Sequence, residues 1–362
     1  MVEIRELIRQ IHHHIFQRVG GVRGLGLRFV AHAFALAMNR HIPHHLQEEM
    51  RAIARGSGTS FSAILMINTL DDVLNVLRRL APHNPHLGCS SFALFGSRSR
   101  DGLLIHGRNL DYHFRGTLLD DRGEVSRLLH RHAVIFVCRP EGRAAFLSVG
   151  WPGQAGTTTA MNRHGISLGN LTSYVRGTSP DGLPTSLLYR IVMEESSNLA
   201  EVASLLNSSR RTIGNNLVVG SGQENRAALF EITRDRVEQV PPMDGLLVAT
   251  NHFVSLALAL RQRPFLLPHS VARWKRLKQL CDRRGISTEE ALAFLGDVGR
   301  DGDVSGDNPF ARVANEGTAV SVLFRPASME MWVGTSEGPP ASRGEFRLVQ
   351  AAEMLGSHGR GL

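Results

Sequence analysis

Two spacings of apolar residues divide the chain near residue 88. Before that point, apolar side chains recur every three or four positions, which places them on one face of a helix. The first such series consists of Ile4, Leu7, Ile8, Ile11 and Ile15. A second helix is predicted over residues 43–55, and a third, capped by Ser60 or Ser62, extends through Leu70 after the break at residues 56–59. Residues 1–80 are therefore expected to be helical.

After residue 88 the apolar segments become short and are separated by Gly, Pro, Asp and Arg, which is typical of strands and turns. Strands are predicted at residues 91–96, 103–107, 133–138, 144–149, 216–220, 227–232, 246–250, 319–324 and 329–333. Helices return at residues 183–194 and 199–206. This order predicts an α+β fold in which two packed sheets are covered by helices.

Composition and charge exclude several classes of protein. A chain of 362 residues that is 42% hydrophobic and 20% charged can bury a large core. The net charge of +8 is spread along the chain without a basic block or interleaved aromatic residues, so we expect no nucleic-acid binding. The most apolar N-terminal stretch, residues 25–38, is interrupted by Arg28 and His32 and is too short to span a bilayer. With no secretory signal recognisable, a cytoplasmic location is the default expectation.

The cysteines and histidines raise the question of a metal site. Three scattered cysteines, Cys89, Cys138 and Cys281, form neither a disulfide framework nor a zinc motif, and the last two are expected in the core. Nine of the 17 histidines lie in the first 88 residues, and His41 and His45 would share one face of a helix. Pro43 lies between them and disfavours a regular helix, and no nearby cysteine or carboxylate completes a set of metal ligands. A metal-binding helical module is therefore kept only as an alternative from a different functional class. We expect no metal and no cofactor.

Cys89 begins the most specific pattern in the chain. The run Cys89-Ser90-Ser91 is followed by His106-Gly107-Arg108-Asn109-Leu110-Asp111-Tyr112. This pattern resembles the acid ceramidase and N-acylethanolamine acid amidase group of N-terminal-nucleophile hydrolases, whose precursors are cut just before such a cysteine. An upstream segment that contains Glu48, Glu49, Gly58 and Asn68 is similar to the same group. The segments "MNRHGISLGNLTS", "LPTSLLYRIVMEE", "VATNHF" and "TAVSVLFRPASMEMWVG" resemble the wider group of choloylglycine hydrolases and penicillin acyltransferases.

The resemblance implies an αββα sandwich, cut between Gly88 and Cys89, in which residues 1–88 form a helical N-terminal segment and residues 89–362 the catalytic domain. It also implies that Arg108 and Asp111 lie beside Cys89 and that a late arginine takes part. We assign that late arginine to Arg273 in preference to Arg261 and Arg263.

The residues themselves suggest how such a site would work. Cleavage before Cys89 would give this residue an α-amine that can accept the proton of its own thiol, and Gly88 can adopt a strained backbone for the cut. Asp111 could then accept a hydrogen bond from the amine while Arg108 holds the carboxylate. Residues three apart on a strand point to opposite faces, so we expect a turn or bulge beginning at Asn109.

Two amides could stabilise an oxyanion, because they donate N–H without titrating. They are Asn251, which follows a predicted strand and matches the family pattern better, and Asn170, in a Gly-Asn pair after an apolar strand. His252 is expected to be a structural neighbour of Asn251, since the α-amine already serves as the base.

The predicted activity is hydrolysis of a linear amide bond through a thioester on Cys89. The resemblance points to lipid-like N-acyl amides, such as ceramides or N-acylethanolamines, and the close alternative is acyl transfer as in penicillin acyltransferases. The apolar helices before Cys89 could contact a membrane surface. No cysteine lies in residues 1–88, so the two fragments must be held together without a disulfide.

Overall fold

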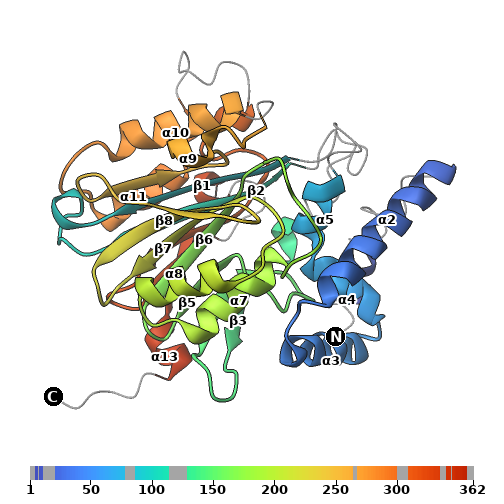
Figure 1. The fold of residues 1–362 in the computed structure, drawn as a ribbon. Coiled ribbons are helices and arrows are strands. Elements are labelled where there is room, and N and C mark those ends of the chain that lie inside the picture. Colours follow the sequence, from blue (N-terminus) through green and yellow to red (C-terminus); the bar gives the residue numbers. More distant parts are fainter. Residues whose placement is uncertain are drawn as a thin grey trace.

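The computed structural model describes residues 5–6, 8–10, 21–77, 86–113, 129–263, 267–299, 309–334, 340–343 and 345–356. Two antiparallel sheets pack face to face, and helices cover the outer face of each sheet (Figure 1). The helices that precede the first strand lie together at one end of this sandwich. The predicted α+β class, an αββα sandwich preceded by helices, is confirmed.

The first sheet has six strands and contains the candidate nucleophile. Its order is β10 (Leu246–Ala249), β1 (His86–Leu94), β2 (Ile105–His113), β11 (Thr318–Arg325), β12 (Glu330–Gly334) and β13 (Phe346–Gln350). β1 and β2 follow each other in the chain and pair along their whole length, from His86 opposite His113 to Leu94 opposite Ile105. Distant parts of the sequence supply β10 and β11, so the neighbours of Cys89 are brought together only by the tertiary fold.

The second sheet has seven strands in chain order. They are β3 (Val134–Cys138), β4 (Phe146–Gly150), β5 (Thr159–Asn162), β6 (Ile166–Thr172), β7 (Asn215–Ser221), β8 (Arg226–Ile232) and β9 (Val237–Val240). Between β6 and β7 the chain forms α7 (Thr185–Glu195) and α8 (Leu199–Ser208), which cover the outer face of this sheet (Figure 1). β6 and β7 are buried at every position because a sheet lies on one side and helices on the other.

The outer face of the six-stranded sheet is covered by α10 (Leu267–Cys281) and α11 (Thr288–Leu295) (Figure 1). Ser287 begins α11 with a reciprocal capping box, in which its side chain accepts from the N–H of Glu290 while the Glu290 side chain accepts from the N–H of Ser287. Short helices complete the chain at α9 (Leu256–Ala259), α12 (Pro340–Arg343) and α13 (Ala351–Leu355).

The N-terminal helices are α2 (Gly21–Asn39), α3 (His44–Ser57), α4 (Phe61–Asn68) and α5 (Leu70–Leu77). Ser60 caps α4, as predicted, by accepting a hydrogen bond from the N–H of Ala63. The predicted third helix is wrong in one respect, because it is two helices that meet at Thr69. Of the first apolar series, Ile8 is described and buried, and the other four positions lie outside the described residues.

One hydrophobic core joins the N-terminal helices to the sandwich. Met38, Leu46 and Ile64 from the helices belong to the same buried cluster as Leu110 of β2 and Phe146 of β4. A second cluster lies between the six-stranded sheet and α10 and α11 and contains Phe92 and Leu323. The N-terminal segment is therefore packed as part of the folded body.

Most of the predicted strands are confirmed within a few residues, with three kinds of difference. β1 starts five residues earlier than predicted, and β2 continues to His113 through the proposed turn at Asn109. Several elements lacked a prediction, namely strands β5, β9 and β13 and helices α9, α10, α11, α12 and α13. Asn170 lies inside β6 and not after a strand, because β6 contains Ser, Gly and Asn, whose polarity conceals a fully buried strand.

Candidate active site

Cys89 lies on β1 with its side chain directed toward the other sheet. Its partner across β2 is Leu110, and both side chains belong to the core between the sheets, whereas Phe92 belongs to the core under α10 and α11. Side chains alternate along a strand, so Cys89 and Ser91 share the inner face with Arg108 and Leu110. The thiol is buried, with the Cys89 residue only 1% exposed.

The backbone of Cys89 is held at the end of β10. Pairing of β1 with β10 starts at Ser91 opposite Ala249, which leaves the N–H and C=O of Cys89 beyond the ladder. Asn251, two residues past the end of β10, accepts the Cys89 N–H on its side-chain oxygen at 2.7 Å. Arg273 donates to the Cys89 carbonyl at 2.7 Å. The predicted residues Asn251 and Arg273 thus both contact the backbone of Cys89.

Arg273 connects the parts of this site. It is buried on α10 and donates to the Oδ1 atom of Asn251 at 2.9 Å, and its Nη1 atom lies 3.6 Å from the Oδ2 atom of Asp111. The two arginines considered as alternatives lie elsewhere. Arg261 pairs with Asp235, and Arg263 donates to the carbonyl of Val175.

Asp111 lies on the opposite face of β2 from Arg108. Its carboxylate is fully buried and accepts from Asn315 Nδ2 at 3.0 Å and from Thr318 Oγ1 at 2.8 Å. The expectation that Arg108 holds this carboxylate is wrong, because Arg273 makes the ion pair. β2 remains a regular strand, and the irregularity lies in β11, where the pairing shifts between Thr318 and Val320.

Arg108 instead spans the two sheets. Its Nε donates to Thr159 Oγ1 on β5 at 2.6 Å, and its guanidinium also donates to the carbonyl and side-chain oxygens of Asn170 on β6. Asn170 in turn donates to Asn215 Oδ1 at 3.2 Å. The described structure therefore places Asn170 beside Arg108, and Asn251 beside the backbone of Cys89.

The electrostatics of the site keep the thiol neutral in the intact chain. Burial raises the pKa of the Cys89 thiol, and the positive charge of Arg108 opposes this shift. Burial also raises the pKa of Asp111, against the effect of Arg273. A neutral thiol is a weak nucleophile, so Cys89 could act as one only if a base close to its sulfur removed the proton.

Asn216 is a residue of this region that sequence reasoning missed. From β7, its Nδ2 donates to the carbonyls of Thr250 and His252, at 2.8 and 2.7 Å, and so fixes the backbone on both sides of Asn251. His252 forms hydrogen bonds with Ser270 at 2.7 Å and with Thr250 at 3.0 Å. Burial lowers the pKa of His252 to about 4, so it is neutral near pH 7, in line with the structural role expected for it.

Asn315, Thr318 and Asp71 were also missed, and Tyr112 was named in the motif but given no role. The phenol of Tyr112 donates to the carboxylate of Asp71 on α5 at 3.4 Å, and its ring stacks edge-on against Trp151 at a centroid separation of 5.5 Å. Burial and the adjacent Asp72 raise the pKa of Asp71 to about 7. In the sequence, Asp71 and Asp72 are recognisable only as two consecutive acids after Asn68. Without the fold, this pattern indicates a functional site only weakly.

The titration of Asp71 predicts how stability depends on pH. A carboxyl group with a higher pKa in the folded than in the unfolded protein stabilises the fold at low pH, and this contribution is lost as the pH rises through about 7. The wild-type protein should lose on the order of 2 kcal/mol of unfolding free energy between pH 5 and pH 8, and Asp71→Asn much less.

Urea denaturation at the two pH values measures this difference. The matched control is Asp282→Asn, since Asp282 is an exposed acid that pairs with Arg98 on the surface. An Asp71→Asn variant with the full wild-type pH dependence would contradict the assignment.

The histidines of the N-terminal segment do not form a metal site within the described residues. His41 lies before α3 and pairs with Asp181 at 3.0 Å, whereas His45 lies on α3 and faces Glu194 at 3.5 Å. No group of three or more potential metal ligands occurs in the described part of the chain. His12, His13 and His14 lie outside the described residues. The described structure gives the metal-binding alternative no support.

The layered sandwich and the buried cysteine near the start of a central strand are those of the N-terminal-nucleophile hydrolases. The chain belongs to the acyl-coenzyme A:6-aminopenicillanic acid acyl-transferase family, whose model matches residues 97–337, about two thirds of the chain. The match includes Arg108, Asp111, Asn251 and Arg273 and begins after Cys89. The family is described by an acyl-transfer activity.

The individual relatives either have low sequence identity to the chain or match only a small part of it. An uncharacterized protein of Archaeoglobus fulgidus is 22% identical over 264 residues, 63% of this chain and 42% of that protein. An N-acylethanolamine-hydrolyzing acid amidase of Caenorhabditis elegans is 38% identical over 78 residues, 22% of this chain and 20% of that protein. The chain thus spans less than half the length of these relatives.

Two solved structures are similar to the chain. A Caenorhabditis elegans N-acylethanolamine-hydrolyzing acid amidase ortholog has a TM-score of 0.47 at 17% identity, covering 72% of this chain and 100% of its own. A mutant of conjugated bile acid hydrolase from Clostridium perfringens has a TM-score of 0.47 at 14% identity, covering 73% of this chain and 93% of its own.

Proposed function

We propose that the protein is an amidohydrolase that cuts its own chain between Gly88 and Cys89 and then hydrolyses linear N-acyl amides through a thioester on Cys89. The observation that carries this proposal is the arrangement at Cys89, where Asn251 and Arg273 hold its N–H and C=O. Asp111 lies within reach of the same arginine. These groups surround the position that an α-amine would occupy after cleavage.

In the self-cleavage step, the Cys89 sulfur attacks the carbonyl carbon of Gly88. The bond from that carbon to the Cys89 nitrogen breaks, the nitrogen gains a proton, and a thioester joins Gly88 to the sulfur. Water then hydrolyses the thioester, which leaves a carboxylate on Gly88 and a free amine and thiol on Cys89. Gly88 suits this step because it offers no Cβ to obstruct the sulfur.

In turnover, the α-amine of Cys89 accepts the thiol proton, and the thiolate attacks the carbonyl carbon of the substrate amide. The proton then passes to the leaving nitrogen as the carbon–nitrogen bond breaks. Water attacks the resulting thioester with the α-amine as base and releases the acid. Asn251 would retain the amine on its side-chain oxygen, and Arg273 would hold Asn251 and Asp111 in place.

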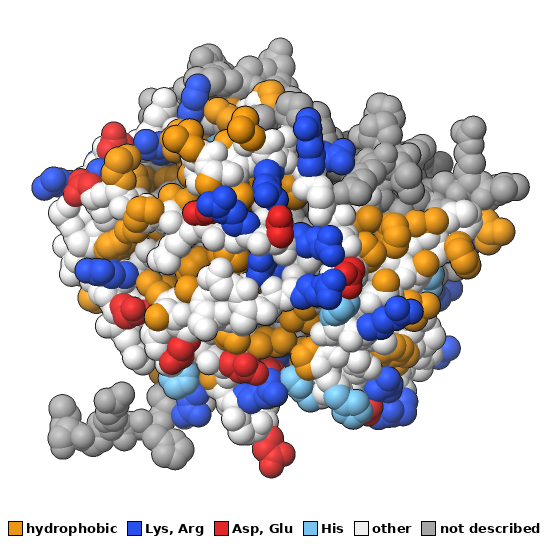
Figure 2. Space-filling model, in the orientation of Figure 1, with side chains coloured by type: hydrophobic (Ala, Val, Ile, Leu, Met, Phe, Trp, Pro, Cys, Tyr) orange, Lys and Arg blue, Asp and Glu red, His pale blue; other side chains and the backbone are white. Residues whose placement is uncertain are grey.

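We propose that the substrate carries a long acyl chain, and exposed apolar residues of the N-terminal helix α2 support this. Leu25, Phe29 and Leu36 project from α2 at helical spacing and are 64%, 76% and 55% exposed. Figure 2 shows apolar side chains gathered over this helix at the edge of the molecule. Within the described residues, no helix is long and apolar enough to cross a membrane. We infer that this surface touches lipid aggregates that present the substrate.

Acyl transfer is the second candidate, and the matching family model favours it because that family is described as an acyl-transferase. In transfer, an amine replaces water in the attack on the Cys89 thioester. Hydrolysis and acyl transfer are separated with a panel of fluorogenic N-acyl amides in which the acyl chain and the amine are varied separately. Each substrate is assayed with and without added amine. Hydrolysis of long-chain amides without an acceptor supports the amidohydrolase, and product formation only with an added amine supports the transferase.

The two fragments would stay together through buried polar contacts between them. Arg190 on α7 is buried, pairs with Glu194 on its own helix and with Glu49 on α3, and lies over the Phe146 ring at 4.8 Å. Asn68 donates to the carbonyl of Gly153 and accepts from the N–H groups of Ala155 and Gly156. These bonds join residues 1–88 to the sandwich without a disulfide.

Glu49→Gln should loosen the cut protein, because it removes the carboxylate that pairs with Arg190 across the two fragments at 3.1 Å. Glu49 is 39% exposed, so the expected loss is about 1 kcal/mol of association free energy. Size-exclusion chromatography in increasing urea should release residues 1–88 at a lower urea concentration than in the wild type.

Glu48→Gln is the matched control, since Glu48 pairs with Arg51 on the same helix and not across the fragments. Equal urea concentrations for the two variants would show that the Arg190 pair does not hold the fragments.

A further inference from the structure

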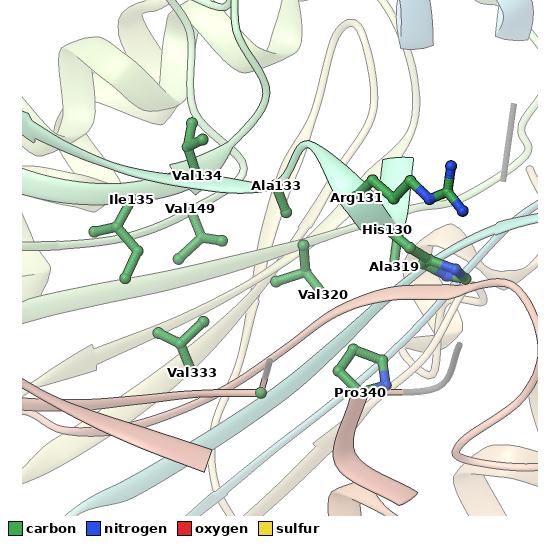
Figure 3. A pocket seen from close by; sticks show the side chains of 11 residues that line it. His130, Arg131, Ala133, Val134, Ile135, Val149, Ala319, Val320, Val333 and Pro340 are labelled. Carbon is green, nitrogen blue, oxygen red and sulfur yellow. The ribbon is translucent and has the colours of Figure 1, made fainter. Parts of the chain in front are cut away.

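The seven-stranded sheet ends in a strand without a charged residue. This strand, β3, pairs only with β4 among the described strands and consists of Val134, Ile135, Phe136, Val137 and Cys138. Val134, Ile135 and Val137 are 36%, 38% and 43% exposed. Figure 3, a view of the pocket that β3 helps to line, shows the side chains of Val134 and Ile135 on opposite sides of the strand. The edge is therefore apolar and accessible on both faces.

The backbone of β3 has hydrogen-bonding groups to offer a further strand. In an antiparallel sheet, alternate residues of an edge strand direct their N–H and C=O groups away from the sheet. Natural edges are usually protected by charged residues, prolines or bulges. β3 contains neither a charge nor a proline, and its pairing with β4 runs without a shift from Val134 opposite Gly150 to Cys138 opposite Phe146. These properties favour the addition of another strand at this edge.

The other edge of the same sheet is protected. Its strand, β9, contains Glu238, which forms an ion pair with Arg236 just before the strand. A charged pair on an edge disfavours the approach of an apolar strand. Two copies that join through β3 would therefore leave only protected edges on the joined sheet. Pairing through β3 would close as a dimer and would not continue as a fibre.

We propose that the protein forms a homodimer in which the β3 strands of two copies pair antiparallel about Phe136. In this register Ile135 of one copy lies opposite Val137 of the other. Val134 likewise lies opposite Cys138. Every cross-strand pair is then apolar, and the two seven-stranded sheets form one continuous sheet. Because β3 is complementary to itself, a second copy of the chain is the partner that fits this edge.

The charges beside β3 favour the same register. Arg131 precedes the strand, Arg139 and Glu141 follow it, and all three are exposed. The proposed register brings Glu141 of one copy to the end where Arg131 of the other lies, so opposite charges meet. A register centred on Ile135 would bring together two positive charges, Arg139 and Arg131. A register centred on Val137 would place Arg139 opposite Ile135, which is a less favourable pair.

Sedimentation equilibrium of the full chain over about 1–100 µM tests the proposal, because interfaces of modest size associate in the micromolar range. The mass should rise from that of one copy to that of two and no further. Hydrogen–deuterium exchange of residues 134–138 should be slower in the dimer, since their outward N–H groups are then hydrogen-bonded. The result does not depend on the proposed function, because β3 contains none of the groups around Cys89.

Two double variants test the register. Ile135→Lys/Val137→Lys places like charges opposite each other twice in the dimer and should raise the dissociation constant at least about tenfold. In Ile135→Lys/Val137→Glu, the new lysine of each copy lies opposite the new glutamate of the other. This variant should dimerise at least about tenfold more tightly than the double-lysine variant. Circular dichroism checks that both variants are folded.

Leu256→Lys is the matched control, since Leu256 is 93% exposed on α9 and is apolar but lies outside β3. It should dimerise like the wild type, and loss of the dimer in this variant would move the interface to α9. The proposal is also overturned by a single copy at every concentration, by larger aggregates, by unchanged exchange of residues 134–138, or by equal affinity of the two double variants. The exchange measurement uses the wild type, so it decides the matter even if a double variant does not fold.

Discussion

The Cys89→Ala variant should remain a single chain of 362 residues, whereas the wild-type protein should be recovered as two fragments, residues 1–88 and 89–362. Without the sulfur no thioester with Gly88 can form, so neither the cut nor the α-amine that depends on it can arise. Amide hydrolysis should fall to the background rate. Intact-mass spectrometry of the purified proteins decides the point.

The control is Cys138→Ala, because Cys138 lies on β3 with its sulfur beside Arg190 and far from the cut in the sheet order. It should be cut like the wild type. The decisive negative result would be a fully active wild-type protein that stays in one piece, since an α-amine base requires the broken bond. Circular dichroism checks that Cys89→Ala is folded. Removal of this small buried side chain should cost little unfolding free energy, so the loss of activity should not come from unfolding.

Asn251→Asp in the cut protein should lower kcat about a hundredfold or more while KM changes little. One hydrogen of the Asn251 amide is engaged by the Thr172 carbonyl at 2.8 Å, and the second can donate to an oxyanion that forms at Cys89. A carboxylate at this position removes that donor and repels the developing charge. Asn251→Ala should also lower kcat, because the donor is missing.

Each Asn251 variant must first be shown to be cut and folded, because Asn251 also contacts the N–H of the bond that we propose is cut. The comparison variant is Asn170→Ala, which removes the amide beside Arg108 on β6. A cut Asn251→Ala protein with the kcat of the wild type would transfer the oxyanion role to Asn170 and to backbone N–H groups. Asn251 would then be a residue that only orders the turn after β10.

The six residues chosen as a candidate site came from widely separated parts of the chain, and the fold distributes them over two connected groups. In the first group, Asn251 and Arg273 contact the backbone N–H and C=O of Cys89, and Asp111 lies beside Arg273. Arg108 and Asn170 form a second group on the inner face. The expected Arg108–Asp111 pair failed because a local bend was assumed in β2 to bring the two side chains together, whereas β2 is straight and a distant helix supplies the partner of Asp111.

The sequence by itself determined the class of fold, the approximate limits of most strands, and the choice of Asp111, Asn251 and Arg273 as neighbours of Cys89. It could do so because apolar spacing within a segment reflects which face of that segment is buried, and because the run from Cys89 to Tyr112 is one hairpin with local pairing. Only the tertiary structure decided which arginine meets Asp111, which amide meets the Cys89 N–H, and how Asn216, Asn315 and Thr318 support them. These contacts join strands and helices far apart in the chain, so their geometry depends on sheet order and on the packing of α10, neither of which any local pattern contains.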